Sequence, residues 1–312
     1  MIYTRIASTG SYLPARRVSN DELAQSVDTS HAWILERTGI EQRHIANDQE
    51  TTVFMGTEAA KQALETAGVS ASDIDMIIVA SCTAEKIFPS TACLIQEALG
   101  VASIPAFDIQ AACSGFIYAL NVSDHFIRSG QAKRVLLIGV EVMTRLVDWT
   151  DRRTCVLFGD GAGAVLLEAS EAPGILKIQF GAEGRHKEVL YMDKAPGSFI
   201  QMQGNVLYKV AVQVLDKAIR QLLDDTNTEL SSIDWMIPHQ ANARMIQATA
   251  EKLGLSFERV MITLNQHANT SAASIPLAFD WGIRQQKIKR GQRLLFEAIG
   301  AGLTWGTALV QY

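Results

Sequence analysis

Internal similarity is the feature of this sequence that most limits its fold. The segment Asp-Ile-Asp-Met-Ile-Ile at 73–78 resembles Ser-Ile-Asp-Trp-Met-Ile at 232–237, and each follows a helix-like run, at 53–67 and 206–223. The two copies lie roughly half the chain apart in the 312-residue sequence. Because a sequence that repeats in this way builds one structural unit several times, we expect two similar halves.

The later segments repeat in the same order. Each copy continues into an apolar helix that ends in Leu-Gly, at 91–100 and 241–254, and then into a strand and a small-residue loop. The loops contain Ala-Cys-Ser at 112–114 and Ala-Asn-Thr at 268–270. A further helix, a Gly-Gln pair and two closing strands follow each loop. We expect these closing strands to bend tightly around the glycines of 159–163 and 300–302.

The apolar strands indicate the fold class. Segments 76–81, 135–140 and 294–299 are nearly continuous apolar runs, typical of sheets covered by helices on both faces. Two such halves stack economically as a five-layered α/β/α/β/α sandwich of the α/β class. We place the halves at 1–170 and 171–312, in one compact unit because no flexible linker separates them. This stacking predicts that the strand-to-helix loops of the halves lie close together.

Composition excludes several classes of function. A net charge of −5 argues against nucleic acid as the main partner. No apolar run reaches the roughly 18 residues that cross a bilayer, so we expect no membrane segment and a cytoplasmic protein. The four cysteines form no Cys-x-x-Cys pair and have no histidine at metal-ligand spacing. The sequence therefore predicts no metal, no disulfide framework and no bound cofactor.

Three residues at or near the ends of predicted strands suggest a catalytic site. Cys113 lies at a predicted helix N-terminus, where the helix dipole favours a thiolate and a lowered pKa, although a buried structural cysteine has the same pattern. His239 follows a strand through Pro238, and Asn269 occupies the second-half loop that corresponds to the Cys113 loop. In such a trio the thiol forms an acyl-enzyme, while imidazole and amide donate hydrogen bonds to a thioester oxygen.

Motifs around these residues resemble those of beta-ketoacyl-acyl carrier protein synthase III, a thiolase-type condensing enzyme. The resemblance spans essentially the whole chain, and its segments are 10–14, 33–40, 111–116, 158–163, 238–242, 269–274 and 304–306. Within the superfamily, thiolases combine Cys and His with a second Cys, elongating synthases use two His, and hydroxymethylglutaryl synthases bring a Glu. The set Cys113, His239 and Asn269 resembles the catalytic set of the priming synthases and of the longer plant polyketide synthases. The short chain favours a priming synthase.

The resemblance implies a ping-pong reaction. Cys113 would accept an acyl group from acyl-coenzyme A, and malonyl-acyl carrier protein would lose carbon dioxide and attack the acyl-enzyme, which initiates type II fatty acid synthesis. His239 and Asn269 would bind the malonyl thioester oxygen. The backbone N–H groups of Cys113 and Ala301 would form an oxyanion hole, provided that Ala301, at the middle of a usual glycine triplet, has a negative φ.

The resemblance also implies contacts for the substrates. Trp33 and Arg37 share a predicted helical face, which suits stacking on adenine and binding of phosphate. The implied coenzyme A contacts are Trp33, Arg37, Arg152, Gly204 and Asn242, and the implied acyl-pocket residues are Phe88, Met143, Phe158, Leu190 and Met202. Bulky side chains in that pocket favour a short primer such as acetyl. A carrier-protein patch would comprise Lys209, Arg244 and Lys252, which otherwise form an ordinary solvated face.

Other interpretations remain open at this point. A homodimer is implied by the resemblance, with Phe88 of one subunit reaching the other's acyl pocket. The alternative enzyme is a synthase III relative of specialised metabolism that uses a longer or unusual acyl group, and a carrier-binding scaffold without chemistry is the third reading. The glycines of 159–163 lack the Lys-Ser/Thr of a phosphate-binding loop, so we expect only a tight bend. His267 would support the site at most.

Overall fold

A computed structural model describes residues 2–312 and contains two main sheets. The first has five strands in the order β1-β7-β6-β4-β5. Strand β4 pairs in parallel with β5 and β6, whereas β7 pairs antiparallel with β6 and β1. Its strands are β1 (Tyr3–Tyr12), β4 (Met76–Ala80), β5 (Ala106–Ile109), β6 (Arg134–Val142) and β7 (Asp160–Ser170).

The second sheet repeats most of this pattern. Its order is β11-β12-β13-β8, with β11 and β12 parallel and the other pairs antiparallel. The N–H of Arg134 donates to Asp75 at the start of β6, and the N–H of Arg293 donates to Asp234 at the start of β12. These matching bonds make β6 and β12 equivalent strands. The strands are β8 (Ile175–Ala182), β11 (Trp235–Pro238), β12 (Arg293–Gly300) and β13 (Thr304–Gln311).

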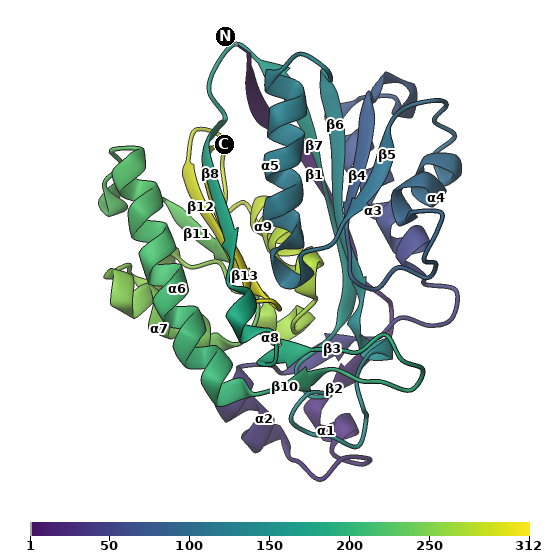
Figure 1. Ribbon diagram of the computed structural model, residues 1–312, viewed down its shortest axis with the longest axis vertical. Helices are drawn as coiled ribbons and strands as arrows, with labels where there is room; N and C mark the ends of the chain where they lie inside the picture. Colours follow the sequence, from purple (N-terminus) through teal and green to yellow (C-terminus); the bar gives the residue numbers. More distant parts are fainter. Residues whose placement is uncertain (1) are drawn as a thin grey trace.

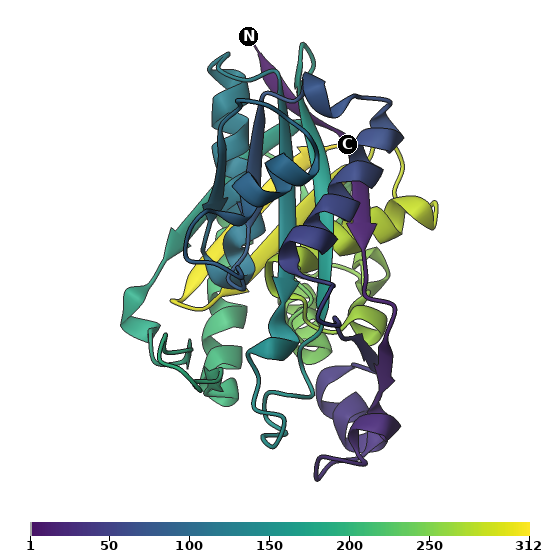
Figure 2. The ribbon, with the colours of Figure 1, turned by 90° about the vertical axis from the view of Figure 1, so that its right-hand side faces the viewer.

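Helices complete a five-layered sandwich. Helices α5 (Gly115–Arg128) and α9 (Ser274–Arg284) lie between the sheets, where an apolar cluster joins residues of both sheets and both helices (Figure 1). Helices α3 (Thr52–Ala67) and α4 (Thr91–Ala98) cover the outer face of the first sheet (Figure 2), and α6 (Gly204–Asp225) and α7 (Ala243–Leu253) cover that of the second. The predicted α/β/α/β/α architecture is therefore confirmed.

Shorter elements gather mostly at one end of the sandwich, below the sheets in Figure 1. They are α1 (Asn20–Leu23), α2 (His31–Thr38), α8 (Leu264–His267), β2 (Arg17–Ser19), β3 (Gln42–His44), β9 (Leu190–Tyr191) and β10 (Gln201–Met202). Single helical turns connect many elements: η1 (Ala71–Asp73), η2 (Ala112–Ser114), η3 (Met143–Arg145), η4 (Gly184–His186), η5 (Leu230–Ser232), η6 (Phe257–Arg259) and η7 (Ser271–Ala273). No helix within residues 2–312 has the length and apolar character needed to span a bilayer.

The glycines of 159–163 do not form the predicted bend, and that prediction is wrong. Strand β7 begins at Asp160, so Gly161 and Gly163 lie inside a regular strand. A Cβ atom on Gly163 would lie 2.7 Å from both the backbone N of Leu277 and Cβ of Pro276. The glycines therefore allow the start of α9 to pack directly on the strand. In the second half, by contrast, a turn between β12 and β13 does follow Gly300, at residues 301–303.

Candidate active site

Two loops bring the predicted catalytic residues to the middle of the molecule. After β5, the single turn η2 contains Cys113 and continues into α5. The corresponding turn η7 continues into α9 in the second half. Both turns begin at a non-glycine residue in the left-handed region, Ala112 with φ 47° and Ser271 with φ 49°. The shared backbone shape confirms that the loops correspond. Cys113 of the first loop and Asn269, just before the turn of the second, line the same pocket.

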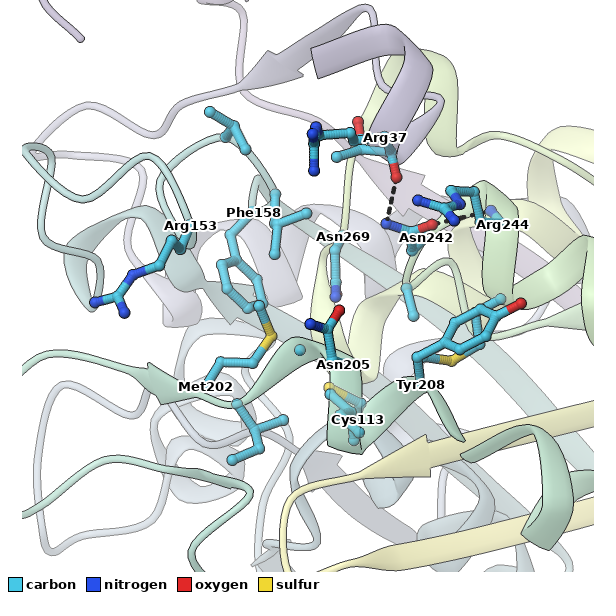
Figure 3. Close-up of a pocket in the computed structure, with 18 of the residues that line it drawn as sticks. Arg37, Cys113, Arg153, Phe158, Met202, Asn205, Tyr208, Asn242, Arg244 and Asn269 are labelled. Carbon is cyan, nitrogen blue, oxygen red and sulfur yellow. Dashed lines mark hydrogen bonds between the residues drawn. The ribbon is translucent and has the colours of Figure 1, made fainter. Parts of the chain in front are cut away.

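Cys113, His239 and Asn269 line a single cavity of about 700 Å³. Cys113 lies below Asn269 in Figure 3, with other lining residues around them. All three side chains are buried, with exposed fractions of 7%, 4% and 6%. The structure therefore brings together the three groups that the sequence places in separate segments.

Hydrogen bonds fix the orientation of the Asn269 amide. Its backbone N–H donates to the carbonyl of Leu157 at 2.9 Å, and its carbonyl accepts from Gly159 at 3.0 Å. The side-chain Oδ1 accepts from the N–H of Ser271 at 2.9 Å. Because Oδ1 already has this partner, the amide nitrogen is the group that remains for the pocket.

His239 is held at the end of β11 by its backbone and its ring. Its N–H donates to the carbonyl of Glu297 at 2.7 Å. Its ring Nδ1 lies 2.6 Å from Oγ of Ser274, which also accepts from the N–H of Gln240. Burial lowers the pKa of His239 to about 3, so the imidazole is neutral at physiological pH.

The predicted lowering of the Cys113 pKa is wrong. Burial raises the pKa of the thiol to about 12, although the Ser271 hydroxyl and the backbone N–H of Cys113 itself act in the opposite direction. The nearby Glu141 carboxyl adds to the rise. Loss of water around the sulfur outweighs the favourable helix N-terminus. The resting group is a thiol, and any nucleophilic step has to begin from that state.

Strand β12 approaches Cys113 more closely than a side chain would allow. A Cβ atom on Gly300 would lie 2.8 Å from the backbone N of Cys113. The positive φ of the following turn falls on Gly302, at 134°, and Ala301 is not among the left-handed residues of 2–312. The condition for a backbone donor at Ala301 is therefore met, although Gly300, rather than Ala301, lines the cavity.

The predicted coenzyme A residues gather at one side of the cavity. Two guanidinium groups lie over the Trp33 indole, with Arg37 at 4.8 Å and Arg152 at 5.1 Å from a ring centroid. Arg152 also donates to the carbonyl of Asp28 at 2.7 Å. Asn242 donates from its amide to the carbonyl of Arg37 at 3.0 Å. All four of these predicted residues line the cavity, as does Gly204.

The predicted acyl-pocket residues separate into three groups. Phe158, Leu190 and Met202 line the cavity. Met143 is buried in the apolar cluster that contains these residues but does not line the cavity itself. Phe88 is 82% exposed, outside the cavity, next to Ile87, which is 77% exposed. The structure does not bring Phe88 to the pocket of its own chain.

The predicted carrier-protein residues are only partly clustered. Lys209 on α6 and Arg244 on α7 line the cavity. Lys252 does not, and its amino group lies 3.4 Å from a carboxyl oxygen of Asp216. The basic residues at the cavity are therefore Lys209 and Arg244, joined by Arg37 and the arginines at 152 and 153.

Several cavity residues were not predicted from the sequence. Asn205 and Tyr208 line the cavity from the first turns of α6, and Arg153 follows Arg152 (Figure 3). Helical spacing could have found Tyr208, because it lies one turn beyond Gly204. Ser274, which contacts the His239 ring, lies within a recognised motif but gave no separate signal.

Comparisons with known proteins agree with this arrangement. Residues 107–184 match the family 3-oxoacyl-[acyl-carrier-protein (ACP)] synthase III, and residues 223–312 match its C-terminal part. The beta-ketoacyl-[acyl-carrier-protein] synthase III of Thiobacillus denitrificans is 50% identical over 100% of both chains, and that of Methylococcus capsulatus is 51% identical over 99% of both. The crystal structure of 3-oxoacyl-[acyl-carrier-protein] synthase III from Aquifex aeolicus is 48% identical, with a TM-score of 0.97, over 99% of this chain and 100% of that chain.

Proposed function

Because the chain belongs to the 3-oxoacyl-[acyl-carrier-protein] synthase III family, the condensing acyltransferases of fatty acid biosynthesis, we propose that it joins an acyl group from acyl-coenzyme A to malonyl-acyl carrier protein. The product is a 3-oxoacyl-acyl carrier protein. One observation carries the proposal: a thiol, a neutral imidazole and an oriented amide line the same buried cavity. The proposed chemistry uses no metal and no organic cofactor.

In the first step Cys113 takes the acyl group. The sulfur attacks the thioester carbonyl, the bond to the coenzyme A sulfur breaks, and the thiol proton passes to that leaving sulfur. The tetrahedral oxyanion would be bound by the N–H groups of Cys113 and Ala301. The close approach of Gly300 to the Cys113 nitrogen supports this assignment, because it brings the end of β12 against the nucleophile loop.

In the second step His239 and Asn269 bind the malonyl thioester oxygen. The bond to the malonyl carboxylate breaks, carbon dioxide leaves, and the electron pair forms an enolate that attacks the acyl carbon and expels the Cys113 sulfur as a thiolate. Ser274 can donate to Nδ1 of His239, which leaves the proton on Nε2 as a donor. Each donor of this kind typically stabilises the transition state by about 3 kcal/mol.

Coenzyme A binding is proposed at the indole of Trp33. An adenine ring between the indole and a guanidinium requires about 7 Å, twice an ordinary stacking distance. Arg152 lies 5.1 Å from the ring, so it has to move outward to admit the base. Arg37, Gly204 and Asn242 would contact the rest of coenzyme A, and Lys209 and Arg244 would contact the acidic carrier protein.

Bulky side chains in the cavity support a short primer. Phe158, Leu190 and Met202 line the cavity, and Met143 packs in the same apolar cluster. We therefore propose acetyl-coenzyme A as the preferred primer. The same proposal includes a cytoplasmic homodimer, since Ile87 and Phe88 form an exposed apolar pair suited to a subunit contact.

A mass-spectrometric assay tests the proposal. Incubation with acetyl-coenzyme A should add about 42 Da, the mass of an acetyl group, to the peptide that contains Cys113. A panel of acyl-coenzyme A substrates from acetyl to decanoyl, followed by malonyl-acyl carrier protein, should release the most carbon dioxide with acetyl. No adduct on Cys113 would refute the mechanism, and a preference for long acyl groups would favour an enzyme of specialised metabolism.

A further inference from the structure

A buried carboxyl group lies beside the active-site loops without a role in the steps above. Glu141 is fully buried on β6. Its Oε2 accepts from the hydroxyl of Thr83 at 2.6 Å and from that of Ser81 at 3.2 Å. Its Oε1 accepts from the thiol of Cys82 at 3.2 Å, and the N–H of Cys82 donates to both oxygens. Within residues 2–312 no basic side chain forms an ion pair with Glu141, and, against the rise that burial causes, the hydroxyl and thiol groups around it act to lower its pKa.

These hydrogen bonds extend to the nucleophile. Sγ of Cys82 lies 4.0 Å from Oγ of Ser271. Although burial raises the pKa of both Cys113 and Glu141, the Ser271 hydroxyl acts to lower each, so it lies beside both groups. Ser271, which has a left-handed φ, begins the turn η7. Glu141, Cys82, Ser271 and Cys113 are therefore neighbouring groups that each carry an exchangeable proton.

The proposed reaction needs a proton at this place. Condensation leaves Cys113 as a thiolate, and the next acylation requires a proton for the leaving coenzyme A sulfur. His239 is neutral and holds no second proton to give. Cys113 is 7% exposed, so bulk water reaches it poorly once the substrates fill the cavity. Beyond the effect of burial, the Glu141 carboxyl acts to raise the pKa of two nearby thiols, Cys82 and Cys113.

We propose that Glu141 stores this proton and delivers it to Cys113 through Cys82 and Ser271. The Glu141 carboxyl loses a proton, the Cys82 thiol and the Ser271 hydroxyl each pass one on, and the Cys113 thiolate becomes a thiol. The carboxylate regains its proton from solvent through the half-buried Thr83 hydroxyl. This inference rests on the proposed function, since it assigns the proton of the same Cys113 cycle.

The protonation preferences of the two end groups agree with the direction of transfer. Burial raises the pKa of Glu141 above its usual range, so the carboxyl retains its proton at a higher pH than an exposed one does. Burial also raises the pKa of Cys113 to about 12, which makes its thiolate a strong base. A proton on Glu141 therefore moves downhill to a newly formed Cys113 thiolate.

A two-part kinetic experiment tests the path. Enzyme carrying a preformed acetyl group on Cys113 is mixed with malonyl-acyl carrier protein, and 3-oxoacyl product and proton uptake from a weakly buffered indicator dye are followed together. The first condensation needs no proton at Cys113, so Glu141→Gln should form product within about twofold of the wild-type rate. Proton uptake and the next acylation should slow at least about tenfold.

Substitutions at Cys82 separate proton transfer from structure. Cys82→Ala should reproduce the Glu141→Gln effect, whereas Cys82→Ser, which keeps an exchangeable proton, should restore turnover to within about threefold of wild type. Cys93→Ala is the matched control, because Cys93 is a partly buried thiol that donates to the carbonyl of Ala106. It should leave both rates unchanged.

Two results would overturn the proton path. Equal slowing of the first condensation and of later turnovers in Glu141→Gln and Cys82→Ala would show a structural role, and unchanged rates in both variants would show none. Failure of wild-type enzyme to acquire an acetyl group on Cys113 would instead refute the proposed function. The two failures are distinguishable because one concerns only the variants and the other the wild type.

Discussion

The loops at η2 and η7 share a backbone conformation but carry different functional side chains. Each starts with a residue of left-handed φ, makes a single helical turn, and leads into a central helix between the sheets (Figure 1). The position of Cys113 in the first loop is occupied by Ala272 in the second. The second loop instead contributes the amide of Asn269 and the hydroxyl of Ser271. Internal symmetry thus places the loops, and individual side chains decide their roles.

The strands next to the two loops differ in a related way. Glu141 on β6 and Gly300 on β12 are equivalent, since each lies seven residues beyond an arginine whose N–H donates to an aspartate. A side chain at position 300 would collide with the backbone of Cys113. Glu141, by contrast, places a carboxyl group near Ser271. One half of the site is shaped by a close backbone approach and the other by a buried acid.

Removal of the Cys113 thiol should have the largest effect on activity, and it tests whether the two loops differ in function. Cys113→Ser should lower the rates of acylation and condensation by at least about 10³-fold, because a buried serine is a far weaker nucleophile. Acyl-adduct mass and carbon dioxide release measure the two steps. Ala272→Ser, which adds a hydroxyl at the equivalent place, should stay within about twofold. Comparable losses in both variants would mean that the nucleophile is not confined to the first loop.

Removal of the amide should affect only one of the two steps. Asn269→Ala should slow condensation about 10²- to 10³-fold through loss of one donor to the enolate oxygen. Acetylation of Cys113 should remain within about threefold, since that step uses backbone donors. Rapid-quench measurement of acyl-enzyme and of 3-oxoacyl product separates the two. A loss shared equally by both steps would assign Asn269 a structural role.

Sequence periodicity predicted the halves, the order of their elements and the meeting of the three candidate catalytic groups. These features follow from local patterns: apolar runs, strand ends, and a loop repeated at the same place in each half. The pKa of Cys113 could not be predicted in the same way. It depends on how completely β12, η7 and the central helices exclude water from the sulfur, which is a property of packing.

Contacts between distant segments account for the other differences. The glycines of 159–163 resemble a bend locally, but their partners are the backbone and Pro276 at the start of α9. The cluster of Cys82, Glu141 and Ser271 comes from three elements far apart in sequence, none with a recognisable spacing. Lys252 shares a helix with Arg244, yet its charge is directed to Asp216 of α6. Each of these depends on tertiary packing that a single sequence does not encode locally.

The Ser274 hydroxyl offers a smaller test of how the second loop serves the site. Ser274→Ala should slow condensation about tenfold, because the His239 ring loses the partner that fixes its tautomer. Acylation of Cys113 should not change. The lowered pKa of His239, about 3, keeps the ring neutral as pH falls from 8 to 5, so wild-type condensation should show no histidine titration in that window. A decline with a midpoint near pH 6.5 would contradict this assignment.

The shared left-handed turn predicts the smallest effect, on stability alone. Glycine adopts a positive φ without strain, so in Ala112→Gly the relief of strain should offset the greater entropy of the unfolded chain, to within about 0.5 kcal/mol. Ala273→Gly, at φ −77°, lacks such relief and should cost about 1 kcal/mol or more. Urea unfolding of both variants measures the difference. An equal cost at both positions would show that the first loop does not store backbone strain at Ala112. The two loops would then share a backbone conformation but no stored strain.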